Sequence, residues 1–226
     1  MSEFLRILEN EVQIVALSFM GTVYIIRLAW MFHFKAGQEV TMSVGDSKTG
    51  VAYSMMNVVM PWAMESARKN WSFYIQFVIF HLGVILGIAA TFIIPYWPEL
   101  FEIKAVVVIF QAVLAAAAVV GVIRFVRRVV SPVMRVISTP DDYFSLVVMT
   151  LFFASGVFAV PNTYEVSEMP LVVFFIMTTF FLVYVPFSKI SHYLYYPFTR
   201  YFLGKTMGHR GVFPRKRGGE LPAGLE

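Results

Sequence analysis

Residues 71–94 read WSFYIQFVIFHLGVILGIAATFII, an apolar stretch without Asp, Glu, Lys or Arg. About 20 such residues in a helix cross a hydrocarbon core of about 30 Å. The stretch lacks the alternation of polar and apolar residues that is typical of strands in outer-membrane barrels. It therefore predicts a transmembrane helix, and it places an imidazole, that of His81, at membrane depth.

The remaining apolar runs predict the rest of the fold. The sequence is 58% hydrophobic and only 14% charged, which excludes an ordinary soluble domain. We expect an all-α integral membrane bundle over residues 1–205, followed by a basic cytoplasmic tail over 206–226. Its five transmembrane helices are predicted at 12–31, 71–94, 103–125, 143–160 and 171–196.

The segments between these runs give weaker signals. The polar stretch 32–70 predicts a loop with a short amphipathic piece that lies on the membrane surface. Residues 1–13 lack the basic region of a secretory signal, so we expect the first helix to be retained. Asp141 and Asp142 precede the fourth run and are well placed to cap its start.

Charge and cysteine content narrow the function classes. The chain has no cysteine, which excludes disulfides, cysteine zinc sites and any iron–sulfur cluster held by this chain. We interpret the net charge of +4 as the basic face of a membrane protein and not as a nucleic-acid surface. Lys and Arg concentrate in 32–70, in 124–135 and after residue 188, which predicts an external N-terminus and a cytoplasmic C-terminus.

Two of the four histidines form the central hypothesis. An ionisable side chain at membrane depth is a functional-site candidate. We expect His81 and His192, on antiparallel helices, to be the axial ligands of one haem iron. Gly83 and Gly87 leave a small-residue groove beside His81 for a macrocycle or a neighbouring helix. Basic side chains on the same side are candidates for the haem propionates: Lys189, Arg200, Arg68, Lys69 and Arg128.

The alternative for both histidines is a hydrogen bond within a helix bundle, without a cofactor. His33 follows the first helix and is interpreted as an interfacial polar residue, with a quinone or haem role left open. His209 lies in the basic C-terminal region and has the weakest claim to a function. The many methionines are interpreted as core filling.

Two short motifs carry a family resemblance. Residues 80–87, FHLGVILG, resemble the haem-ligand helix of the gamma subunit of respiratory nitrate reductase. Residues 185–192, VPFSKISH, are similar to the last helix of that family, as are the following Pro197 and 199–201. In size the chain resembles most the cytochrome-b-like subunit of the high-molecular-weight cytochrome (Hmc) redox complex of sulfate-reducing bacteria.

The resemblance implies a b-type cytochrome in the cytoplasmic membrane, acting in anaerobic respiration or sulfate reduction. It implies a cytoplasmic iron–sulfur subunit, further membrane subunits, a periplasmic multihaem cytochrome c and a periplasmic iron–sulfur protein as partners, with menaquinone as a second candidate cofactor. Two-haem members have a second histidine pair, where this chain has Thr91 and Phe174. We therefore expect one haem, near the cytoplasmic face.

Two other readings stay open. In the first, the chain is a structural membrane anchor without haem. In the second, it is a transporter or channel. The second of these is weakened by the lack of Asp or Glu inside the predicted spans.

Overall fold

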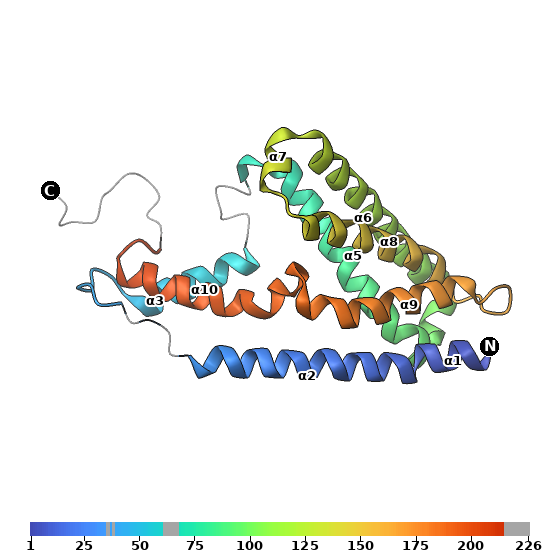
Figure 1. The fold of residues 1–226 in the computed structure, drawn as a ribbon. Coiled ribbons are helices and arrows are strands. Elements are labelled where there is room, and N and C mark those ends of the chain that lie inside the picture. The colour runs from blue at the N-terminus through green and yellow to red at the C-terminus, as the bar shows by residue number, and fades with distance from the viewer. Residues whose placement is uncertain (35–36, 38, 61–67, 215–226) are drawn as a thin grey trace. The chain divides into compact units, whose positions relative to one another are not determined.

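The computed structural model describes residues 1–34, 37, 39–60 and 68–214, which form helices and contain no strand (Figure 1). Five helical stretches are long and apolar enough to cross a membrane: Glu3–His33, Trp71–Tyr96, Lys104–Val130, Pro140–Ala159 and Met169–Phe187. The predicted all-α class is thus confirmed for the described residues, as is the presence of five helices long and apolar enough to span a membrane. This is the architecture of a multi-pass membrane protein.

The chain divides into two compact units, where the sequence predicted one domain over 1–205 and a tail. The first unit contains residues 1–30 and 74–190, and the second contains 31–73 and 191–226. The hydropathy profile detects only the apolar runs. It gave no sign that the polar segment 32–70 associates with residues after 190.

The first unit carries most of the apolar helices. They are α1 (Glu3–Glu9), most of α2 (Glu11–His33) and of α5 (Trp71–Tyr96), the 3-10 turn η2 (Pro98–Glu102), α6 (Lys104–Val130), α7 (Pro132–Ile137), α8 (Pro140–Ala159) and α9 (Met169–Tyr184). Phe153 of α8 and Phe174 and Phe175 of α9 are fully buried at the centre of its core. Aromatic side chains therefore fill the space between helices that are apolar on nearly every face.

Small residues bring the helices of this unit close together. Helices α6 and α8 lie side by side (Figure 1). Buried Gly121 of α6 faces Thr150 of α8, and buried Gly83 of α5 faces Ala117 of α6. Such contacts let helices associate where the solvent supplies no hydrophobic driving force.

The second unit is built on two helices, α3 (Ser47–Val59) and α10 (His192–His209), which pack along each other (Figure 1). A Cβ at Gly204 would lie 2.7 Å from the Cα of Val51, and one at Gly208 would lie 2.6 Å from the carbonyl oxygen of Asp46. The sequence placed a short amphipathic piece in this region. The helix is present, and one of its faces is covered by α10.

The predicted helix over 171–196 is interrupted. Helix α9 ends at Tyr184, and the turns η3 (Val185–Phe187) and η4 (Lys189–Ser191) precede α10. Pro186 provides no backbone N–H, which favours a break here. Ser188 is extended, with φ −100° and ψ 169°. The apolar span thus stops at Phe187, and His192 is the first residue of a separate helix.

Candidate functional site

His81 lies in α5, and its ring orientation is set by its own helix. Its Nδ1 is 2.8 Å from the carbonyl oxygen of Phe77, and the two rings are 3.9 Å apart between centroids. A carbonyl oxygen only accepts, so we assign the proton of the neutral ring to Nδ1 and the lone pair to Nε2. Histidines that bind metals commonly donate their other ring N–H to a carbonyl in this way. The donor chemistry of His81 therefore fits an axial ligand.

The face of α5 that carries His81 is distinct from the face that packs inside the unit. Residues one turn apart along a helix share a face, and the neighbours of His81 on that face are exposed: Phe77, Ile85 and Ile88. Gly83 and Gly87 are buried on the opposite side. His81 is thus presented outward from the first unit.

The sequence left open whether the groove at Gly83 and Gly87 receives a macrocycle or a neighbouring helix. The structure shows helices at both positions. A Cβ at Gly87 would lie 2.6 Å from Cε1 of Phe152 in α8, and Gly83 packs on Ala117 and Phe153. The role of these glycines in cofactor binding stays a prediction, and their role in helix packing is direct.

His192 is exposed and is the first residue of α10. It belongs to the second unit, whereas His81 belongs to the first. Each histidine is therefore placed within its own unit, and the pairing of the two as ligands of one iron stays a prediction.

Lys189 and Arg200, two of the five basic candidates for the haem propionates, both have partners within the chain. Lys189 Nζ is 2.9 Å from Asp142 Oδ2 and donates to Thr139 Oγ1 at 2.8 Å. Arg200 donates from Nη2 and Nε to the carbonyl oxygen of Ser54, at 2.8 and 3.1 Å. A propionate would share these cations with existing contacts.

The other two histidines lie in the second unit. His33 ends α2 and lies edge-on to Phe34, with ring centroids 5.4 Å apart. His209 ends α10, and its Nε2 is 2.7 Å from the carbonyl oxygen of Thr41. Arg210 forms an ion pair with Glu39 at 2.8 Å beside it. These contacts give His209 a structural role in closing residues 39–45 onto the end of α10.

A polar cluster at the start of α8 was missed by the sequence, which assigned Asp141 and Asp142 only a capping role. Tyr184 Oη donates to Asp141 Oδ1 at 2.5 Å and lies 2.9 Å from Ser145 Oγ. Lys189 adds its ion pair with Asp142. The paired aspartates were visible in the sequence, but their partners lie more than 40 positions away.

A buried carboxyl near the N-terminus was also missed. Glu9, the last residue of α1, is only 6% exposed. Nearby in the sequence, Gln13 Nε2 donates to the carbonyl oxygen of Phe175 and to Thr179 Oγ1 of α9, at 3.1 and 2.7 Å. The apolar stretch Glu3–His33 thus carries carboxylates at its start, ahead of the predicted span 12–31, which itself contains no Asp or Glu.

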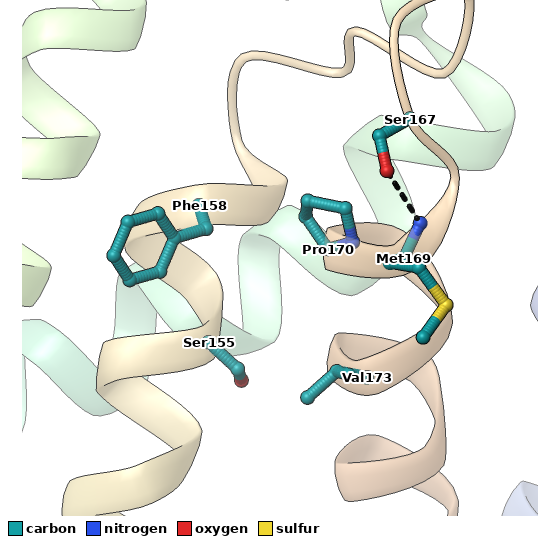
Figure 2. Close-up of a pocket in the computed structure, with 6 residues that line it drawn as sticks. All are labelled: Ser155, Phe158, Ser167, Met169, Pro170 and Val173. Atoms are coloured by element: carbon teal, nitrogen blue, oxygen red, sulfur yellow. Dashed lines mark hydrogen bonds between the residues drawn. The ribbon is translucent and has the colours of Figure 1, made fainter.

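A groove of about 330 Å³ lies between the end of α8 and the start of α9 (Figure 2). Ser155 and Val173 point toward each other across it, and Ser167 Oγ accepts a hydrogen bond from the Met169 amide at 3.4 Å. Its remaining lining is apolar: Phe158, Met169 and Pro170. None of the predicted site residues lines it.

Comparison with known proteins gives one distant relative to report. A curated protein of the sulfate reducer Nitratidesulfovibrio vulgaris (strain Hildenborough), named only "Protein", is 26% identical over 174 residues, which cover 75% of this chain and 74% of the relative. No family model matches the chain. No solved structure matches it.

Proposed function

We propose that this chain is an electron-transfer subunit of a respiratory redox complex in the cytoplasmic membrane, with one b-type haem held by His81 and His192. The observation that carries the proposal is the bond from His81 Nδ1 to the Phe77 carbonyl oxygen at 2.8 Å. It leaves the lone pair on Nε2 of a ring at membrane depth, which is the form that a metal ligand requires. The relative in a sulfate reducer is consistent with this setting.

In the proposed chemistry, the protein holds the haem and orients the ring of its ligand His81. The Phe77 carbonyl fixes the ring of His81 and raises the basicity of its Nε2. The exposed neighbours of His81 on α5, Phe77, Ile85 and Ile88, are apolar and would keep water from the ligand where this face meets lipid or another subunit. When bound, the haem supplies a one-electron couple. Its potential depends on its axial ligands and on how far water is excluded from it.

One haem near the cytoplasmic face sets the route of the electrons. A single haem does not bridge about 30 Å of hydrocarbon. We infer that electrons pass between menaquinone or a neighbouring membrane subunit and a cytoplasmic iron–sulfur subunit. The N-terminus is then external, and the basic loops face the cytoplasm. The periplasmic cytochrome c and iron–sulfur protein connect through other membrane subunits.

Substitution of single histidines tests the proposal. We expect the purified chain to show reduced b-type absorbance, and His81→Ala and His192→Ala each to remove it. The matched control is His33→Ala, which alters an imidazole at the end of α2 and retains the spectrum. Loss of absorbance in the control alone, or an unchanged spectrum in both ligand variants, would refute the assignment.

The second candidate is a structural anchor without haem. It is favoured by the use of Lys189, Arg200, Gly83 and Gly87 in contacts within the chain. An anchor retains its partner subunit in pull-down experiments and shows no haem absorbance in the parent protein. The spectrum of the parent protein therefore separates the two candidates before any variant is made.

A further inference from the structure

The link that follows α9, residues 185–188, contains the 3-10 turn η3, and three of its four residues are buried. Val185, Pro186 and Ser188 are each less than 9% exposed. Ser188 Oγ donates to the carbonyl oxygen of Val185 and accepts from the amide of Ile190, both at 3.1 Å. A link that is packed and hydrogen-bonded has few alternative conformations.

Two consecutive carboxylates at the start of α8 contact both ends of this link. Asp141 accepts from Tyr184 Oη at 2.5 Å, before the link, and from the Lys189 amide at 3.4 Å, after it. Asp142 forms the 2.9 Å ion pair with Lys189 Nζ. Charge-assisted contacts of this kind are shorter and stronger than neutral ones.

The start of α8 is itself held in place. The backbone N and the Oγ1 of Thr139 both donate to Asp142 Oδ2, at 2.8 and 2.9 Å. Arg128 of α6 donates to Ser138 Oγ at 2.6 Å, and its carbonyl oxygen lies 3.3 Å from Tyr143 Oη. The two aspartates therefore connect the link to the end of α6, within the first unit.

We propose that Asp141 and Asp142 are positioning residues, which hold the link and Lys189 in one conformation at the end of the first unit, directly before His192. His192 follows Lys189 by three residues, and Ser191 between them is buried. The part of this proposal that concerns ligation depends on the proposed haem. The part that concerns the link does not.

A distance measurement tests the link without haem. The chain has no cysteine, so Phe158→Cys with Phe187→Cys gives one spin-labelled pair on exposed positions of the first unit, one in α8 and one in the link. In the full chain in nanodiscs we expect a narrow distance distribution. We expect the width of this distribution to at least double in Lys189→Met and in the double variant Asp141→Asn with Asp142→Asn. The conservative variant Lys189→Arg should keep the narrow distribution.

The matched control removes a comparable ion pair at another place in the same unit. Arg6→Gln breaks the 3.0 Å pair of Arg6 with Glu11 and should leave the distribution unchanged. A broad distribution in the parent, or equal widths in the parent and the Lys189→Met variant, overturns the proposal.

The haem gives the second readout. We expect Lys189→Met to broaden the low-spin electron paramagnetic resonance signal of the ferric haem, because a less restrained His192 samples several ring orientations. Haem content should fall less than in His192→Ala. A sharp, parental signal overturns the positioning of a ligand. If the parent holds no haem, the proposed function and the ligation part fail together, while the distance measurement still decides the link.

Discussion

Among single residues, the ring of His81 carries the proposed ligation, because its contact with the Phe77 carbonyl oxygen sets which nitrogen is protonated. The sequence shows an imidazole inside an apolar run that is long enough to span a membrane, and this is sufficient to mark it as a candidate. It does not say whether the ring bonds its own helix or another one. The 2.8 Å contact with the Phe77 carbonyl oxygen decides the orientation, and it depends on a rotamer that periodicity does not show.

Asp46 gives a prediction on pH at the same scale. Its carboxylate accepts from Thr49 Oγ1 and from the amides of Thr49 and Lys48 at the start of α3. The hydrogen bonds from Thr49 and then Lys48 lower the pKa of Asp46 below its ordinary 3.8. A lowered pKa in the folded state means that the stabilisation of α3 is present above pH 3.8 and is lost as the pH falls through the folded value.

Amide exchange of α3 between pH 6 and pH 2, corrected for intrinsic rates, measures this loss. Asp46→Asn keeps an equally good helix cap that does not titrate, so its α3 should show no such step in protection. Identical pH profiles for the two proteins would contradict the role of the carboxylate.

For whole elements, the sequence located the spans better than their ends. Hydropathy found all five apolar runs because the bilayer demands long stretches without charge. It extended the last one to residue 196, since Tyr193, Leu194 and Tyr195 continue the apolar character past the break at Ser188. It could not pair α3 with α10, because that contact depends on small residues more than 140 positions apart, such as Gly50 and Gly204.

Substitution of Gly208 tests this helix pair. A Cβ there would lie 2.6 Å from Asp46 O and 2.8 Å from Gly50 Cα, and backbone atoms do not move aside easily. Overpacking of this kind costs about 1–3 kcal/mol, against a gain of roughly 1 kcal/mol for replacing glycine in a helix. We expect Gly208→Ala to lower amide-exchange protection in both α3 and α10.

The control for this prediction is Gly21→Ala in α2, where a Cβ meets nothing within 4 Å. It should leave protection in α3 and α10 unchanged. If Gly208→Ala retains parental protection in both helices, they do not pack as closely as the structure describes.

For the whole molecule, the distribution of Lys and Arg predicts the orientation in the membrane, and a labelling experiment tests it. Val136 in α7 and Val166 between α8 and α9 are each 86% exposed. We expect Val136→Cys to react with a membrane-impermeant maleimide only from the cytoplasmic side, and Val166→Cys only from the outside.

Because the parent has no cysteine, it serves as the unlabelled control in intact cells and in inverted vesicles. The reverse pattern of labelling would place the basic loops outside, on the side away from the proposed cytoplasmic partner.

The number of b-type haems per polypeptide tests the proposed function most directly. It is measured on the purified chain by the pyridine haemochrome spectrum together with amino-acid analysis. We expect one haem per chain, with a low-spin signal typical of two imidazole ligands. A value of zero would make the chain an anchor, and a value of two would require ligands beyond His81 and His192.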